Sequence, residues 1–167
     1  MPGFAPIVGL KAEVLILGSM PSQISLSLYQ YYANPRNAFW WIMSQIYHFD
    51  PSLSYTQRTQ ALSNRAVAVW DVLHDCERPG SLDSAIVKGS ERVNDFDRFV
   101  SQHPELRLIV FNGATAEKIF RRYYSKLLTD TSSVIKSHRC PSTSPAYASM
   151  SIDTKLDAWR HVLNQPS

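Results

Sequence analysis

The amino-acid sequence predicts an α/β domain built around a mostly parallel sheet. Short apolar runs have the character of strands that are covered on both faces. Between them lie segments whose apolar residues recur at three- and four-residue steps, as in helices with one buried face. Alternation of strands and helices favours parallel strands joined by right-handed crossovers, with ligands bound at the carboxyl ends of the strands.

The expected elements follow one another along the chain. They are a strand at 13–18, helices at 37–47 and 57–64, a strand at 66–70, a helix at 94–102, a strand at 106–111, a helix at 114–127, a strand at 134–135 and a helix at 152–163. The first strand is an unbroken apolar run closed by Gly18, and the helix after it carries a stripe of aromatic and aliphatic side chains. Thr56 is the expected N-cap of the next helix, and the second strand consists of small and β-branched residues.

Turn-forming residues separate the expected elements in the second half of the chain. A loop is expected over 76–89, where proline and glycine interrupt any regular pattern. The helix that follows stops ahead of Pro104, because the residue before a proline disfavours helical backbone. The apolar run after it is a strand, and Asn112-Gly113 turns the chain into the next helix. Two β-branched residues give the fourth strand, and the final helix has one apolar face.

Length and composition bound the class of protein. A chain of 167 residues fits a single domain, expected over 1–167 with its core at about 12–163, and it can bury a core without disulfides or metals. Hydrophobic residues make up 44% and charged residues 19%, which argues against an intrinsically disordered chain. Neither a membrane span nor a secretory signal is visible. We expect a cytoplasmic monomer with its two cysteines reduced, without metal or cofactor.

Positive charge is concentrated in one stretch of the chain. Residues 107–139 hold seven Lys or Arg and two acids, a net +5, whereas the remaining residues carry −2, so that the whole chain carries +3. Such a stretch suits an anionic partner. A solvated helix face accounts for Arg121, Arg122 and Lys126 equally well.

Aromatic residues make up 11% of the chain and crowd together. Eight of the 21 residues from Tyr29 to Phe49 are aromatic. Core packing accounts for most of them. Tyr31 and Tyr32 are better placed to face a flat ligand, on which aromatic rings stack.

Three segments concentrate polar side chains near the expected strand ends. They are Gly18-Ser19-Met20-Pro21-Ser22, the stretch Tyr31-Tyr32-Ala33-Asn34-Pro35-Arg36-Asn37-Ala38-Phe39-Trp40, and Cys140-Pro141-Ser142-Thr143-Ser144-Pro145-Ala146. Asn37 is either the N-cap of the helix that it opens or a catalytic amide, and one residue can be both. Arg36 beside a helix N-terminus suits phosphate. The hydroxyls of the third segment also suit phosphate oxygens, although a stiff surface loop is the simpler explanation of that segment alone.

Taken in order, these motifs resemble those of the uracil-DNA glycosylase superfamily, and most closely its hypoxanthine-DNA (deoxyinosine) glycosylases. The resemblance also rests on Trp70-Asp71-Val72-Leu73, Cys76-Glu77-Arg78-Pro79-Gly80-Ser81 and Lys155-Leu156-Asp157-Ala158-Trp159, and it spans about residues 14–162. It implies a three-layer α/β/α fold with a four-stranded, mostly parallel central sheet and a DNA groove across the strand ends. It also implies a base-excision repair enzyme that flips a deaminated base out of DNA and hydrolyses its N-glycosidic bond.

The resemblance implies a role for each motif. Asn37 matches the candidate catalytic asparagine that holds the attacking water, and Asn34 is the nearby alternative. The expected base pocket consists of Gly18, Ser19, Met20, Tyr31, Tyr32, Asp71 and Asn112. The expected DNA contacts are Pro21, Ser22, Arg36, Arg139, Ser142, Thr143, Ser144, Pro145 and Ala146. Asp71 either reads the base edge or caps a turn, and Asn112 is either a pocket amide or part of an Asn-Gly turn.

Departures from the family pattern narrow the expected substrate. Ser19 and Met20 stand where many members carry the Asp or Asn that positions water, and Ser22 stands where glycine is common. The last motif lacks the histidine of the best-known uracil enzymes. These departures point away from strong uracil activity and toward hypoxanthine, with uracil or xanthine as further substrates.

The reaction expected is simple hydrolysis. No lysine stands in the catalytic motifs as an obvious Schiff-base nucleophile, so strand cleavage is not expected. The main rival hypothesis is a non-catalytic module on the same fold that binds damaged or abasic DNA. A small-molecule nucleoside hydrolase is the third hypothesis, and the lack of an obvious carboxylate cluster makes it the weakest.

Overall fold

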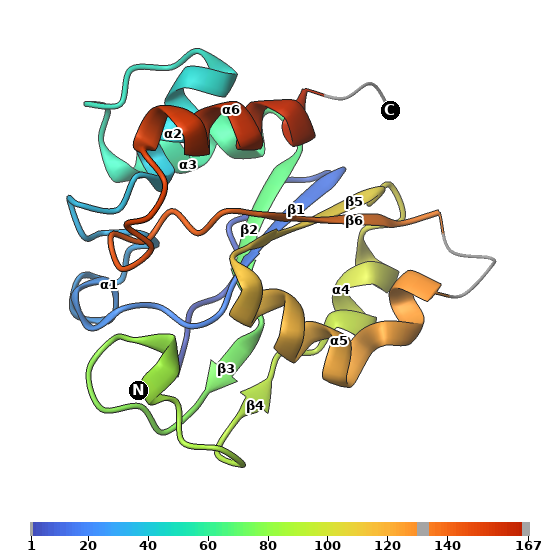
Figure 1. Cartoon of the computed structure of the whole chain (residues 1–167). Helices are drawn as coiled ribbons and strands as arrows, with labels where there is room; N and C mark the ends of the chain where they lie inside the picture. The colour runs from blue at the N-terminus through green and yellow to red at the C-terminus, as the bar shows by residue number, and fades with distance from the viewer. Residues whose placement is uncertain (1, 130–133, 165–167) are drawn as a thin grey trace.

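The structure of the protein, a computed structural model, describes residues 2–129 and 134–164 (Figure 1). In chain order its elements are β1 (Val14–Gly18), α1 (Gln23–Leu28), α2 (Phe39–Tyr47), α3 (Tyr55–Ser63), β2 (Val67–Asp71), β3 (Leu73–Asp75), the 3-10 turn η1 (Asp83–Ala85), β4 (Arg92–Val93), α4 (Phe96–Gln102), β5 (Leu108–Asn112), α5 (Ala114–Thr129), β6 (Lys136–Cys140) and α6 (Ile152–Leu163).

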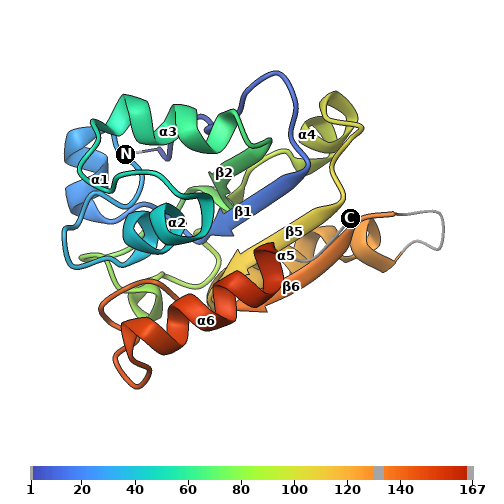
Figure 2. The same cartoon turned by 90° about the horizontal axis from the view of Figure 1, so that it is seen from above.

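The central sheet has four parallel strands in the order β2-β1-β5-β6. Helices α2, α3 and α6 cover one face and α4 and α5 cover the other, which Figures 1 and 2 show from two directions. The side chains of β1 alternate between the two cores: Val14 and Ile16 pack under α2 and α6, whereas Leu15 and Leu17 pack against α4 and α5. The predicted three-layer α/β/α fold with its parallel sheet is thus confirmed.

Several element bounds differ from those expected, and two of the differences have a clear physical reason. The fourth strand is not at 134–135 but is β6, whose residues Lys136, His138 and Arg139 are exposed because it lies at the edge of the sheet. An edge strand with polar side chains lacks the apolar run by which the other three strands are recognised. The N-cap of α3 is Ser54, not Thr56.

Local hydrogen bonding explains the start of α3 and of α2. The Ser54 hydroxyl oxygen accepts from the backbone N–H of Gln57, and the Gln57 side-chain oxygen accepts from the backbone N–H of Ser54. The pair therefore forms a capping box. Helix α2 begins at Phe39, two residues after the expected start, and Ala38 is its N-cap residue. The side chain of Asn37 still supports this helix end, because its Oδ1 accepts from the Phe39 N–H at 2.9 Å.

Two small parts of the fold are not expected from the sequence. Helix α1 follows the first polar turn, with Ser22 as its N-cap. Strands β3 and β4 pair antiparallel and enclose the whole loop expected over 76–89. The pairing fastens both ends of that loop near the carboxyl end of β2, which brings its middle over the end of the central sheet (Figure 1). No helix in the described ranges is long and apolar enough to cross a membrane.

Candidate active site

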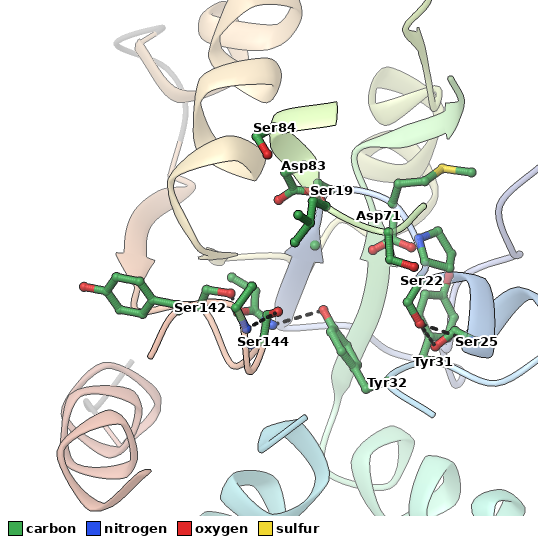
Figure 3. Close-up of a pocket in the computed structure, with 18 residues that line it drawn as sticks. Ser19, Ser22, Ser25, Tyr31, Tyr32, Asp71, Asp83, Ser84, Ser142 and Ser144 are labelled. Atoms are coloured by element: carbon green, nitrogen blue, oxygen red, sulfur yellow. Dashed lines mark hydrogen bonds between the residues drawn. The ribbon is translucent and has the colours of Figure 1, made fainter. Parts of the chain in front are cut away.

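A pocket of about 320 Å³ opens at the carboxyl ends of β1, β2 and β5 (Figure 3). All seven residues of the expected base pocket line it, namely Gly18, Ser19, Met20, Tyr31, Tyr32, Asp71 and Asn112. Five of the expected DNA contacts line it as well: Pro21, Ser22, Ser142, Ser144 and Ala146. Parallel strands bring these distant segments together because their carboxyl ends meet at one edge of the sheet.

The back of the pocket is packed tightly around Gly18. Gly18 is level with Asp71 on the neighbouring strand. A Cβ atom on Gly18 would lie 2.6 Å from Asp71 Oδ1 and 2.8 Å from the hydroxyl oxygen of Tyr32. Glycine is therefore required at the end of β1, because any side chain would displace two pocket groups.

Asp71 is a buried acid, and one of its carboxyl oxygens makes no hydrogen bond within the described residues. Its residue is 3% exposed, and its Oδ2 has no hydrogen-bond partner among the described residues. Burial raises the pKa of Asp71 to about 7, the negative charge of Asp83 adds to the rise, and Arg78 opposes it. Below that pH the carboxyl group is neutral, and it can then both donate and accept a hydrogen bond.

The raised pKa of Asp71 predicts a pH-dependent stability. The unfolded chain loses this proton near pH 3.8 and the folded chain near pH 7, so stability is lost as the pH rises from about 4 to about 7. A shift of this size amounts to about 4 kcal/mol at most. We expect Asp71→Asn not to show this loss, so in urea-unfolding experiments its free energy of unfolding rises relative to that of the wild type between about pH 4 and about pH 7. Parallel stability profiles of the two proteins would contradict the assignment.

Asn112 joins three parts of the pocket. Its Nδ2 donates to the Tyr32 hydroxyl at 3.2 Å and to Thr143 Oγ1 at 3.0 Å, and its Oδ1 accepts from the Thr143 N–H at 2.9 Å. Both amide protons are thus used within the protein. Because the Tyr32 hydroxyl oxygen accepts from Asn112, its own proton is directed elsewhere. Asn112 therefore holds Tyr32 and the 141–146 loop in place and does not itself offer an amide proton to a ligand.

The two tyrosines have different surroundings. Tyr31 is 3% exposed, donates its hydroxyl to the Ala5 carbonyl at 2.9 Å, and accepts from Trp40 Nε1 at its own carbonyl. Tyr32 stacks on Phe39 with ring centroids 4.0 Å apart and reaches into the pocket beside Asn112 (Figure 3). Burial raises the pKa of both hydroxyls, so both keep their protons at neutral pH.

The 141–146 loop is held by bonds from both sides. Thr143 is 1% exposed, and its carbonyl accepts from the Ala38 N–H at 3.0 Å. Lys155, also buried, donates from Nζ to the Ser144 carbonyl at 3.2 Å. The hydroxyl oxygens of Ser142 and Ser144 accept from backbone N–H groups within the loop, so their hydroxyl protons are available for other acceptors.

The expected catalytic amides lie outside this pocket. Asn37 and Arg36 line a second hollow of about 450 Å³, together with Thr143 and Pro145. Alternate residues of the 141–146 loop thus face the two hollows, and the loop separates Asn37 from the pocket. Asn34 lines neither hollow, and its Oδ1 accepts from the Arg36 N–H at 3.0 Å. The last expected DNA contact is exposed on β6, where Arg139 pairs with Glu117 at 3.6 Å.

The loop between β3 and β4 supplies pocket residues that are not among the expected site residues. Ser81, Leu82, Asp83 and Ser84 line the pocket opposite the 141–146 loop (Figure 3). Asp83 Oδ1 accepts from the Ser19 hydroxyl at 2.6 Å. For Asp83 the only sequence signal is the Cys76–Ser81 motif just before it, since Asp83 itself stands in an irregular polar stretch.

The described residues contain no group of three or more His, Cys, Asp or Glu that could hold a metal ion. Cys76 is half-buried and Cys140 is buried, and both are free thiols. The polar side chains that line the pocket carry carboxyl, amide and hydroxyl groups.

A parallel sheet between two layers of helices, with a pocket at its strand ends, defines a three-layer α/β protein, and in this class of fold ligands bind at that edge of the sheet. Comparison with known proteins makes the class specific. The family model of the uracil DNA glycosylase superfamily matches residues 5–165, and the chain belongs to this superfamily.

Named relatives share most of the chain. A protein of Methanosarcina barkeri named hypoxanthine DNA glycosylase is 35% identical over 136 residues, which cover 78% of this chain and 85% of the relative. A protein of the same name from Methanosarcina acetivorans is 37% identical over the same coverage. The solution structure of a Methanosarcina acetivorans protein, provisionally assigned as a uracil DNA glycosylase, superposes with a TM-score of 0.78 at 30% identity and covers 96% of this chain and 97% of its own.

Proposed function

We propose that this protein is a DNA glycosylase that hydrolyses the N-glycosidic bond of a deaminated base, with hypoxanthine as the principal substrate and uracil or xanthine as further ones. The superfamily membership and the two relatives named for hypoxanthine support this substrate. The observation that carries the proposal is the pocket at the strand ends, where a tyrosine hydroxyl and a buried carboxyl group, whose pKa burial raises to about 7, line a cavity of about 320 Å³.

The neutral Asp71 suits the edge of a deaminated base. Hypoxanthine presents an N–H donor beside a carbonyl acceptor, and a protonated carboxyl group offers the matching acceptor and donor. The Tyr32 proton supplies a further donor for the departing base, because the Tyr32 oxygen is already occupied by Asn112. A base stacked within the duplex enters the pocket only when its nucleotide is flipped out. The free energy of flipping is lowest at a mispaired nucleotide, so deaminated positions are favoured.

The reaction proposed is hydrolysis without strand cleavage. Among the described residues no lysine lines the pocket, so a Schiff base with deoxyribose has no nucleophile there. Asn37 is proposed to hold the attacking water, with Asn34 as the alternative, on the basis of the family resemblance. Since the 141–146 loop separates Asn37 from the pocket, this role requires the sugar of the flipped nucleotide to lie against that loop.

The DNA backbone is proposed to cross the strand ends. The hydroxyls of Ser142 and Ser144 flank the pocket on one side, and Ser22 flanks it on the other. Arg36 and Arg139 add positive charge on the outer side of the 141–146 loop and on β6. Hydroxyl and arginine groups of this kind contact phosphates and fix the register of the duplex.

The test is base release from DNA that contains one deoxyinosine. The wild type is expected to leave an abasic site that alkali converts into a strand break, and Asn37→Ala is expected to slow excision about 10²-fold without weakening DNA binding. A non-catalytic binding module would instead give tight, salt-sensitive binding with no product. Cleavage of free inosine but not of DNA would identify a nucleoside hydrolase and would contradict the proposal.

A further inference from the structure

Among the residues that the structure describes, two carboxyl groups line the pocket, and they lie in different surroundings. The titratable residues of the pocket are Asp71, Asp83 and three tyrosines. Burial raises the pKa of Asp71 to about 7, so Asp71 is mostly protonated only below that pH, and burial also raises the pKa values of Tyr31 and Tyr32. The amide of Asn37 can orient a water molecule but cannot take its proton. Asp71 is enclosed at the end of β2, whereas Asp83 is exposed at the pocket and held by a hydrogen bond from Ser19, so Asp83 is the carboxyl group that a water molecule reaches more easily.

Asp83 is fixed in the pocket by the turn at the end of β1. Ser19 follows β1 directly, is buried, and donates to Asp83 Oδ1 at 2.6 Å. The distance is that of a strong hydrogen bond between a hydroxyl and a carboxylate. The side chains of Ser19 and Asp83 meet at the upper wall of the pocket (Figure 3).

The loop that carries Asp83 is fastened to the same turn. The guanidinium group of Arg78 donates to the Pro21 carbonyl and to the Ser81 carbonyl. The Gln23 N–H donates to Ser81 Oγ at 3.0 Å. These bonds tie the segment just before Asp83 to the residues just after Ser19, so the carboxylate is held from both sides.

Asp71 and Asp83 also differ in environment. Asp71 is enclosed, whereas Asp83 is exposed on a loop, and the charge of Asp83 helps to raise the pKa of Asp71. Many glycoside hydrolases use two carboxyl groups, a neutral one as the acid and a charged one beside the sugar, which becomes positive as the bond breaks. Proximity of a negative charge to that sugar lowers the barrier.

We infer that Asp83 is a catalytic carboxylate and that Ser19 is its positioning residue, an inference that rests on the proposed glycosylase function. The oxygen of water forms a bond to C1′ of deoxyribose while the C1′–N bond breaks and its electron pair leaves with the base. The water proton passes to Asp83, which later releases it to solvent. The departing base, held by Asp71 and Tyr32, takes a proton from solvent, and the DNA strand stays intact.

The experiment compares excision rates under single turnover, with enzyme in excess over duplexes that contain deoxyinosine, deoxyuridine or deoxyxanthosine. Asp83→Asn keeps an oxygen that can accept from Ser19 but removes the charge, and it is expected to slow excision at least 100-fold with the DNA Kd changed less than threefold. Glu77→Gln is the matched control, because it removes one negative charge from the same loop outside the pocket. It is expected to excise at the wild-type rate.

Ser19→Ala tests the positioning role. It is expected to slow excision about tenfold in the wild-type background and less than threefold in the Asp83→Asn background, because the two residues act through one carboxylate. An Asp83→Asn rate within threefold of the wild type would overturn the inference and leave the glycosylase function intact. A wild type that releases none of the three bases would overturn the proposed function, and the inference with it.

Discussion

Replacing Asn112 with alanine is expected to slow base excision about 100-fold and to lower the free energy of unfolding by about 1–3 kcal/mol. The change removes three hydrogen bonds that join β5 to Tyr32 and to Thr143. The buried backbone N–H of Thr143 then loses its acceptor, and the 141–146 loop loses its link to the sheet. A loop displaced by about 1 Å presents its hydroxyls to the DNA in the wrong place, which is enough to cost a factor of 100.

Thr143→Val is the matched variant for Asn112→Ala. It removes one hydroxyl from the network but keeps the bond between the Thr143 N–H and Asn112 Oδ1. We therefore expect a smaller effect, about tenfold on the single-turnover rate. Urea unfolding measures the stability of both variants. Wild-type rates in Asn112→Ala would show that the 141–146 loop is placed without this network.

Gly18→Ala is expected to reduce excision about 100-fold while leaving the binding of undamaged DNA unchanged. The added Cβ would lie 2.6 Å from Asp71 Oδ1 and 2.8 Å from the Tyr32 hydroxyl oxygen. Neither side chain can retreat freely, because Asp71 is enclosed and the Tyr32 ring is stacked on Phe39. Both groups proposed to hold the base must therefore shift.

Gly9→Ala provides the control for the steric effect. A Cβ there would meet Ser63 at 3.3 Å, and neither residue lines the pocket, so its effect is expected on stability alone. The two variants are compared in single-turnover excision and in the binding of an undamaged duplex. A Gly18→Ala protein with the wild-type rate would show that the back of the pocket does not contact the base.

The buried strands could be predicted because each of them is a continuous apolar run in the sequence. β1 and β5 lie between two neighbouring strands and two layers of helices, so their residues form unbroken apolar runs. β6 could not be found in this way, because an edge strand exposes polar side chains. The Ser54–Gln57 capping box has the pattern Ser-x-x-Gln, yet the nearby Thr56 competes with Ser54 as a plausible cap.

The pocket residues could be predicted where they follow a strand or stand in a motif of the family resemblance, as Tyr31 and Tyr32 do. Gly18, Asp71 and Asn112 end β1, β2 and β5, and the topology alone brings them to one edge. Asp83 lies 64 residues from Ser19 in the chain and comes from an irregular loop, so only the three-dimensional structure shows their contact. Asn37 shows the opposite case: a residue close to the pocket motifs in sequence is separated from the pocket by a loop.

The two edges of the sheet are protected from other molecules in different ways. Ile7 exchanges two hydrogen bonds with Val69, at 2.8 and 2.9 Å, so a segment near the N-terminus occupies the outer side of β2. β6 at the opposite edge instead carries the exposed cations Lys136 and Arg139. Strands of a second copy would bring like charges together there, which disfavours edge-to-edge aggregation. The same cations that suit an anionic partner such as DNA thereby help to keep copies of the protein apart at high concentration.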